Sequence, residues 1–326
     1  MKVSVIICTY NYARFLPQCL ESVLSQTRTP DEIIVVDDGS TDETPEVVKR
    51  YEGIRYIRQD HAGKVVAFNK GLEVTTGDII CHLDADDYWF ERKVERLIDI
   101  FSCYPSAGGI IHDAVIIHED EAPPKELPPN GFPQMLDLEK AILSAFVYLP
   151  SKYRNLSNRY FKGWSIIPFA GGITVRREII QQYLPLPKSI NLSTDGFLWF
   201  VSAIHGLVYL PEVLCVYRHH KGSYWGGNPQ AMAGQIELYR WLIHHPYFSK
   251  HLSPKGRRLF VAKLIEDALI YELNGGPRNS FSFRTILIFY LLSVGILPGW
   301  KHWAMGLAFP IAKIARQVIH HLKGRA

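Results

Sequence analysis

The sequence predicts an α/β fold, in which a mostly parallel sheet carries helices on both faces and is followed by a helical C-terminal region. Three features indicate this fold. Continuous apolar runs, typical of strands covered on both faces, alternate with segments of helical periodicity. The connections between them are short, as in successive strand–helix–strand units. From about residue 229 onward the apolar pattern is helical only.

Four expected strands lie near the N-terminus, and each is a short apolar run: residues 4–8, 32–36, 54–57 and 78–83. An expected helix follows each of these strands. The first, third and fourth helices are expected at residues 13–26, 63–74 and 90–101. The second begins at a cap formed by Ser40, Thr41 or Asp42 and continues to residue 51. Beyond these we expect strands at 108–118 and 207–217, a strand followed by a helix within 169–183, and helices at 137–148 and 194–205.

Two domains are expected, residues 1–225 and residues 226–326. Within the first domain, residues 119–165 are rich in proline and then in aromatic residues. A segment of this length with little regular structure inside a compact domain usually has a function of its own. We therefore interpret residues 119–165 as an insert that acts as a lid.

The net charge of +4 is unevenly distributed along the 326 residues. No acidic residue follows Glu272, whereas seven basic residues do, so residues 1–272 sum to −3. Residues 311–322 place apolar side chains on one helical face and basic or polar ones on the other. This pattern predicts a helix lying in the plane of an anionic membrane; an amphipathic helix packed on the body is the alternative. Residues 285–300 are uncharged but short for a membrane-spanning helix.

The cysteines and the N-terminus bear on the cellular compartment. The five cysteines include no CxxC pair, which argues against a disulfide scaffold and favours a reducing compartment. The first apolar run has six residues, too few for the core of a signal peptide. We therefore expect a cytoplasmic protein, peripheral at the inner face of the plasma membrane. A nucleic-acid partner is not expected, because no recognisable binding module accompanies the basic tail.

Three groups of candidate ligand-binding residues lie at the carboxyl ends of expected strands, where parallel sheets bind their ligands. These are Cys8-Thr9-Tyr10, Asp37-Asp38 and the acidic cluster Asp84-Ala85-Asp86-Asp87. Mg²⁺ and Mn²⁺ bind carboxylate oxygens and commonly bridge to phosphate groups. The acidic cluster is therefore a candidate binding site for a metal ion together with a diphosphate. Tyr10 offers a ring on which a base could stack. A solvated acidic turn and helix capping remain the alternatives for these clusters.

Three familiar kinds of site find no support in the sequence. The first strand is followed by CTYNYA rather than by GxGxxG, and no GxxxxGK[ST] occurs, so neither helix-borne phosphate loop is present. A zinc site at Cys215, His219 and His220 would need a fourth ligand, and no further cysteine or histidine lies nearby in the sequence.

Five segments together resemble the inverting glycosyltransferase family 2, with its GT-A fold and Rossmann-like sheet: VSVIICTYN, EIIVVDDGSTDET, GKVVAFNKGL, TTGDIICHLDADD and VYRHH. The resemblance covers residues 2–100 strongly and residues 165–225 weakly. It implies that residues 1–225 are the catalytic domain, in which the insert at 119–165 would be an acceptor lid or an acceptor-binding segment.

The resemblance also implies roles for individual residues. Asp84 and Asp86 match the metal-binding DxD motif, and Asp195 matches the catalytic base in Thr194-Asp195-Gly196. His220 is implied both in binding the diphosphate and as a metal ligand. The remaining residues implied in donor binding are Cys8, Thr9, Tyr10, Asp38, Lys64, Asn69, Asp84 and Arg218.

Several positions depart from the family pattern. The usual Glu before the base is Thr194, the usual Pro of the first motif is Cys8, and Phe68 replaces a common Arg. The segment from Gln235 to Trp241 has two residues too many for the QxxRW motif of processive members. This argues against a secreting polysaccharide synthase.

The expected function is therefore inverting, Mn²⁺- or Mg²⁺-dependent transfer of a sugar from a nucleotide sugar, most frequently a UDP-sugar in this family. The acceptor would be a hydroxyl of a saccharide or a lipid-linked molecule in cell-envelope polysaccharide, glycolipid or glycoprotein assembly. A domain that binds a nucleotide sugar or a partner without catalysis is the second hypothesis. A nucleotidylyltransferase is the third, but the Gly-rich, Arg-containing loop that normally opens one is absent after residues 4–8.

Overall fold

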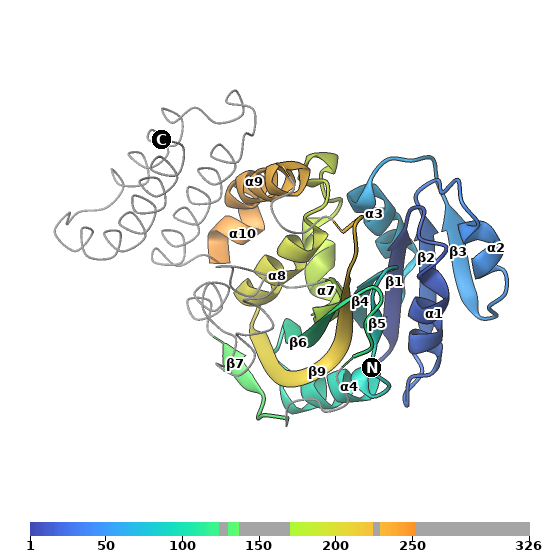
Figure 1. The fold of residues 1–326 in the computed structure, drawn as a ribbon. Coiled ribbons are helices and arrows are strands. Elements are labelled where there is room, and N and C mark those ends of the chain that lie inside the picture. The colour runs from blue at the N-terminus through green and yellow to red at the C-terminus, as the bar shows by residue number, and fades with distance from the viewer. Residues whose placement is uncertain (124–129, 137–169, 224–228, 252–326) are drawn as a thin grey trace, which may run out of the picture. The chain divides into compact units, whose positions relative to one another are not determined.

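One sheet organises the part of the chain that the computed structural model describes, residues 1–123, 130–136, 170–223 and 229–251 (Figure 1). Its strand order within these residues is β3-β2-β1-β4-β8-β6-β9-β5, and β7 pairs with β9. The strands are β1 Val3–Thr9, β2 Glu32–Asp37, β3 Ile54–Arg58, β4 Ile79–Asp84, β5 Tyr88–Trp89, β6 Gly109–His118, β7 Gln134–Leu136, β8 Ile173–Arg176 and β9 Leu207–His219.

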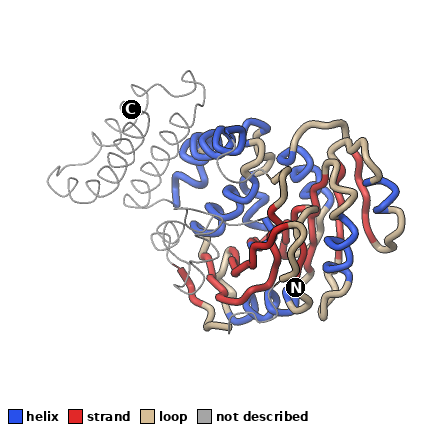
Figure 2. The backbone as a smooth tube through the Cα atoms, viewed as in Figure 1, coloured by secondary structure: helices blue, strands red, loops and turns tan. Residues whose placement is uncertain are grey.

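Helices lie on both sides of the sheet, as the tube in Figure 2 shows. The α-helices are α1 Leu16–Leu24, α2 Thr44–Val48, α3 Lys64–Val74, α4 Lys93–Cys103, α7 Arg177–Ile180, α8 Thr194–Ile204, α9 Pro229–His244 and α10 Pro246–His251. Three short 3-10 helices accompany them, η1 Ala170–Gly172, η2 Gln181–Tyr183 and η3 Lys188–Ile190. All of these elements belong to one compact unit, Met1–Gly256.

The sheet is parallel in its first half and mixed in its second. β3, β2, β1 and β4 run parallel to one another, as the sequence predicts. β8 is antiparallel to both β4 and β6, whereas β6 and β9 are parallel. β5 and β7 run antiparallel to β9. Strand direction in the second half could not be predicted, because apolar runs do not encode it.

Most expected elements are confirmed, with shifts at their ends. The helix expected at 13–26 begins only at Leu16, because residues before it form a turn in which Phe15 N–H donates to the Tyr12 carbonyl at 3.0 Å. The helix expected at 90–101 is α4, Lys93–Cys103, and the last expected strand continues to His219. β5 and β7 were not expected, since two and three residues are too few to show a period.

The pleat of β4 separates two environments. Ile79, Cys81 and Leu83 belong to the core cluster that also contains residues of α1, α2 and α4. Alternate residues of a strand point to opposite faces, so His82 and Asp84 share the other face. There the His82 ring packs against Phe68 of α3, with ring centroids 4.7 Å apart. The site is therefore built on the face of the sheet that α3 covers.

Several expectations fall on residues outside the described ranges. They are the helix at 137–148, most of the insert at 119–165, the uncharged segment 285–300 and the amphipathic helix at 311–322. Among the helices that are described, none has the length and apolar character needed to cross a membrane.

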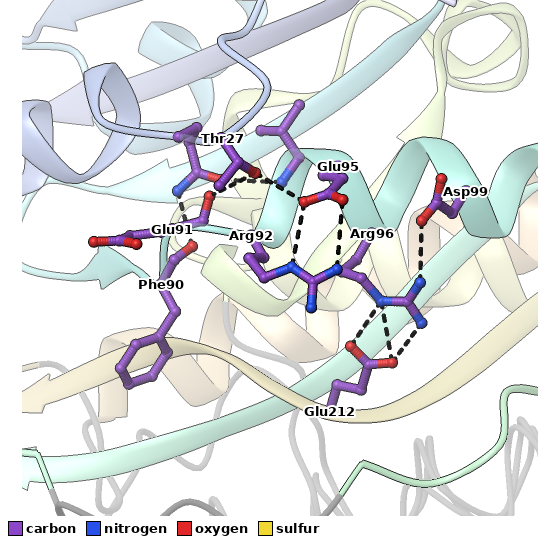
Figure 3. Close-up of polar contacts among 10 residues, drawn as sticks. Thr27, Phe90, Glu91, Arg92, Glu95, Arg96, Asp99 and Glu212 are labelled. Atoms are coloured by element: carbon purple, nitrogen blue, oxygen red, sulfur yellow. Dashed lines mark hydrogen bonds and ion pairs between the residues drawn. The ribbon is translucent and has the colours of Figure 1, made fainter.

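An ion pair ties α4 to β9 (Figure 3). The Arg96 guanidinium donates to both carboxylate oxygens of Glu212, with its shortest nitrogen–oxygen distance 2.6 Å. Glu212 is only 3% exposed, so its charge has little solvent to stabilise it. Arg92, the N-cap residue just before α4, pairs with the exposed Glu95 of that helix at 3.3 Å. The Glu212 carboxylate is thus buried and joins two elements, whereas Arg92 and Glu95 form an exposed local pair.

We expect Arg96→Met to lower the free energy of unfolding by about 2 kcal/mol or more, because it leaves the buried Glu212 carboxylate without its cation. Arg92→Met is the matched control on the same helix and should leave stability nearly unchanged, since its pair is exposed. Urea denaturation curves of the two variants measure both effects. Equal destabilisation would contradict this assignment.

Candidate active site

Three acidic side chains gather at the carboxyl end of β4. One carboxylate oxygen from each of Asp84, Asp86 and Asp87 lies within 4.8 Å of the others. Asp87 is 2% exposed and accepts the backbone N–H of Arg218 at 2.9 Å. Burial, and then the charges of Asp86 and Asp84, hold the pKa of Asp87 well above its usual range. These hard oxygen donors fit Mg²⁺ or Mn²⁺, whose charge would offset the crowding of carboxylates.

Lys64, the first residue of α3, joins this cluster to the expected base. Its Nζ lies 2.7 Å from Asp84 Oδ1 and 3.5 Å from Asp195 Oδ1. Burial would lower the pKa of Lys64, but the charges of Asp195 and Asp84 hold it above its usual value. Burial would likewise raise the pKa of Asp84, but Lys64 keeps it below its usual range. The ammonium and the Asp84 carboxylate are therefore a charged pair.

Asp195 lies in the first turn of α8, where helix N–H groups favour a negative charge. The polar contacts that its side chain makes with described residues fall on Oδ1: the Thr194 hydroxyl donates to this oxygen at 3.1 Å, and Lys64 Nζ lies 3.5 Å from it. Burial raises the pKa of Asp195 to about 6, although the Lys64 ammonium opposes this rise. Among the described residues, none hydrogen-bonds to Oδ2, so this oxygen is the one available to take up a proton.

His82 is a part of the site that the sequence reasoning missed. It is fully buried, with Nδ1 3.8 Å from Asp195 Oδ1 and Nε2 3.8 Å from Asp84 Oδ1. Burial and then the Lys64 charge lower the pKa of His82 to about 3, so its ring is neutral. Its spacing of two residues from Asp84 in a buried strand was the signal that could have identified it.

His220, just after β9, contacts the acidic cluster directly. Its Nε2 lies 3.0 Å from Asp86 Oδ2, and the Gly222 N–H donates to its Nδ1 at 3.0 Å. Since Nδ1 accepts, Nε2 carries the proton and donates to Asp86. In this arrangement His220 holds the Asp86 carboxylate in place. Its direct ligation of a metal stays a prediction.

The Arg218 side chain occupies a different environment. Its guanidinium lies over the rings of Phe15, 4.7 Å from the centroid, and Tyr88, 5.2 Å from the centroid. It also donates to Gln18 Oε1 of α1. Arg218 is close to the acidic cluster through its backbone bond to Asp87, and its expected contact with a diphosphate stays a prediction.

Asp38, expected to bind the nucleoside, organises the loop that leads to Lys64. Its Oδ1 accepts the Gln59 side-chain amide at 2.7 Å and the Ala62 N–H at 2.8 Å. Its Oδ2 accepts the Gly63 N–H at 2.8 Å and lies 2.9 Å from His61 Nδ1. Asp38 is 3% exposed, so its carboxylate is committed to this loop, and its contact with a nucleoside stays a prediction.

The other predicted donor residues are spread over two environments. Tyr10 is 39% exposed and stacks on the His61 ring with centroids 4.1 Å apart, which makes it an accessible aromatic surface. Cys8 is buried, and this burial raises the pKa of its thiol; Lys64 and Asp84 are among the charges that act on it. Thr9 is buried as well, and its Oγ1 has no hydrogen-bond partner among the described residues.

Asn69 has a structural role. Its side chain donates to the Leu186 carbonyl at 2.8 Å and accepts the Leu186 N–H at 3.0 Å. It thereby ties α3 to the segment that precedes η3 and α8. Its expected place in the donor site stays a prediction.

The structure thus brings together Cys8, Lys64, Asp84, Asp86, Asp195 and His220 and adds His82 and Asp87 to them.

Comparisons with solved structures agree with the fold described above. TarS of S. aureus in complex with UDP-GlcNAc has a similar structure, with a TM-score of 0.55 and 13% sequence identity; the match covers 84% of this chain and 86% of TarS. The mannosyltransferase PcManGT from Pyrobaculum calidifontis in complex with GDP-Man and Mn2+ is also similar, with a TM-score of 0.55 and 18% identity; the match covers 97% of this chain and 87% of PcManGT. The fold is therefore the GT-A fold of glycosyltransferases.

The sequence comparisons identify the family. An uncharacterized glycosyltransferase of Nostoc, alr2836, is 32% identical over 227 residues, which are 68% of this chain and 65% of that protein. The uncharacterized glycosyltransferase YibD of Escherichia coli is 42% identical over 101 residues, 30% of this chain and 29% of that one. The match thus spans less than two thirds of either relative. The profile described as "Glycosyl transferase family 2" matches residues 4–184, and the chain belongs to this family.

We expect the Asp195 carboxyl to titrate with a midpoint near pH 6, above that of an exposed aspartate, because burial disfavours its charged form. Lys64→Met should raise the midpoint further, since the ammonium stabilises the carboxylate. The measurement is a ¹³C NMR titration of aspartate-labelled protein, in which Asp195→Asn identifies the signal. A midpoint near 4 in the wild type, or a fall in Lys64→Met, would contradict the described environment.

Proposed function

We propose that this protein is an inverting, metal-dependent glycosyltransferase that moves a sugar from a nucleotide sugar to a hydroxyl acceptor. The observation that carries the proposal is the placement of Lys64 Nζ between Asp84 and Asp195. It brings a carboxylate with a raised pKa next to an acidic cluster that fits a divalent cation. A general base and a site for a charged leaving group are the two needs of this chemistry.

In the proposed reaction, Asp195 Oδ2 takes the proton of the acceptor hydroxyl while that oxygen attacks the anomeric carbon. The bond from this carbon to the nucleoside diphosphate breaks in the same displacement, which inverts the anomeric configuration. The contacts of Thr194 and Lys64 on Oδ1 orient the carboxylate. A raised pKa makes Asp195 a stronger base than an exposed aspartate while leaving it ionised at neutral pH.

Asp84, Asp86 and Asp87 would hold Mn²⁺ or Mg²⁺. When bound, this ion supplies positive charge to the departing diphosphate. His220 holds Asp86 through its Nε2–H and would join the ligands only if its Nδ1 bond to Gly222 broke.

The donor would lie across the carboxyl ends of β1, β2 and β4. We propose that Tyr10 stacks on the base and that Cys8, Thr9 and Asp38 line the nucleoside side. Arg218 and Asn69 stay in this proposal as donor residues on the resemblance alone. The names of the structural neighbours support a nucleotide-sugar donor, because those proteins were solved with UDP-GlcNAc and with GDP-Man and Mn2+. A UDP-sugar is the donor that we propose to test first.

We expect a UDP-sugar with Mn²⁺ to raise the melting temperature, since a ligand bound only by the folded state stabilises it. Asp86→Ala should lose the Mn²⁺-dependent part of this shift. Asp195→Asn should keep the shift but lose about 10²- to 10⁴-fold in sugar transfer, the contribution of a general base.

Nucleoside diphosphate release with a hydroxyl acceptor measures the transfer. A thermal shift without transfer by the wild type, over a panel of saccharide and lipid-linked acceptors, would favour a non-catalytic binding domain instead. Transfer by Asp195→Asn at the wild-type rate would reject Asp195 as the base.

We further propose that the protein is cytoplasmic and peripheral at the inner face of the plasma membrane, where a lipid-linked acceptor would be presented for cell-envelope assembly. The basic, acid-free sequence after Glu272 and the amphipathic pattern of residues 311–322 support this.

Replacing Lys313, Arg316 and Lys323 by Gln should weaken binding to anionic vesicles by about 100-fold, at about 1 kcal/mol for each basic residue near the surface. Co-sedimentation with phosphatidylglycerol vesicles measures this, and neutral phosphatidylcholine vesicles give the baseline. Lys49→Gln with Arg50→Gln, just after α2, is the matched control and should bind like the wild type. Unchanged binding of the triple variant would reject the membrane contact.

A further inference from the structure

The buried His82 ring is the polar group of the site that no step above uses. Both of its nitrogens lack a hydrogen-bond partner among the described residues, although the side chain is fully buried. A buried polar group without a partner is costly, so a residue that remains in such a place needs an explanation. Phe68 packs against the ring, but this contact would serve an apolar residue equally well.

Each nitrogen of His82 faces one carboxylate of the site. Nδ1 lies 3.8 Å from Asp195 Oδ1, and Nε2 lies 3.8 Å from Asp84 Oδ1. An approach of less than 1 Å would bring either pair to hydrogen-bond distance. A neutral imidazole has one N–H, so it can donate to one of these carboxylates but not to both.

The two carboxylates differ in how well they are already satisfied. Lys64 Nζ lies 2.7 Å from Asp84 Oδ1 and 2.8 Å from Asp84 Oδ2, so both oxygens of this carboxylate have a partner. The same ammonium lies 3.5 Å from Asp195 Oδ1, and the Thr194 hydroxyl donates to that oxygen as well. The N–H of His82 therefore gains more by pointing at Asp195, with Nε2 left facing an oxygen whose charge Lys64 already balances.

Resting on the proposed function, we propose that His82 is a positioning residue for the base: its Nδ1–H donates to Asp195 Oδ1 and fixes the carboxylate so that Oδ2 faces the acceptor. Lys64, Thr194 and His82 then hold the same oxygen from three elements, α3, α8 and β4. The pleat explains the arrangement, because it puts His82 on the face of Asp84 and so ties the base to the strand that ends in the metal-binding cluster.

Three substitutions of His82 in the full chain distinguish a hydrogen-bond donor from a side chain that only fills space. The side-chain nitrogen of Asn can take the place of Nδ1, that of Gln the place of Nε2, and Phe keeps the ring without either. We expect His82→Phe and His82→Gln to lower kcat about 10- to 100-fold, the loss of one hydrogen bond to a charged group. His82→Asn should keep most of the activity. The KM for the donor should stay within about twofold in all three, since His82 acts on the base.

The comparison of His82→Asn with His82→Gln decides the proposal even if His82→Phe fails to fold. Equal kcat values for Asn and Gln, or a wild-type kcat for Phe, would overturn it. A loss that appears in the donor KM instead of kcat would overturn it as well.

A second measurement does not depend on activity. Long-range ¹H–¹⁵N NMR of histidine-labelled wild-type protein reports which nitrogen carries the proton, and the His82 signals are those missing in His82→Asn. We expect the Nδ1–H form; the Nε2–H form would overturn the proposal. If the wild type transfers no sugar but shows the Nδ1–H form, the proposed function fails, while the inferred orientation of the N–H toward Asp195 keeps its support.

Discussion

The carboxylates at the end of β4 and at the start of α8 can lie close together only because one ammonium group stands between them. Lys64 contacts Asp84 and Asp195, and each member of this group is largely shielded from water. Charges of like sign in such a place repel strongly unless an opposite charge balances them. The elements that carry these residues, β4, α3 and α8, must therefore meet at one point. The proposed chemistry depends on this meeting, because it sets the acid–base group beside the acidic cluster.

Much of this site was predictable from the sequence. The apolar runs that form β1, β2 and β4 place their polar ends at one edge of a parallel sheet, and so they predicted that Tyr10, Asp38 and Asp84 would be near one another. The acidic cluster was recognisable because carboxylates follow a buried strand directly. Asp195 could be found only through resemblance, since a single aspartate at a helix start is usually explained by helix geometry alone.

Other features depend on three-dimensional contacts that no local pattern encodes. The sequence indicated strands in the second half of the sheet but not that β8 runs against its neighbours. The resemblance assigned Asn69 to the donor site, and only the fold shows that both polar atoms of its amide also bind the backbone of Leu186, far along the chain. The proton position on His220 follows from a bond to Gly222 that is visible only in the fold.

Asp38 shows how a buried carboxylate can fix a loop partly through its backbone. Besides the side chains of Gln59 and His61, its carboxylate binds the backbone amides of Ala62 and Gly63. The path of the chain into α3, and with it the place of Lys64, therefore depends in part on main-chain groups. Asp60 is exposed and Ala62 contributes its N–H. Related chains could therefore vary at positions 60 and 62 and still place the lysine at the same point. Asp38 could not vary in this way, because its carboxylate holds the loop.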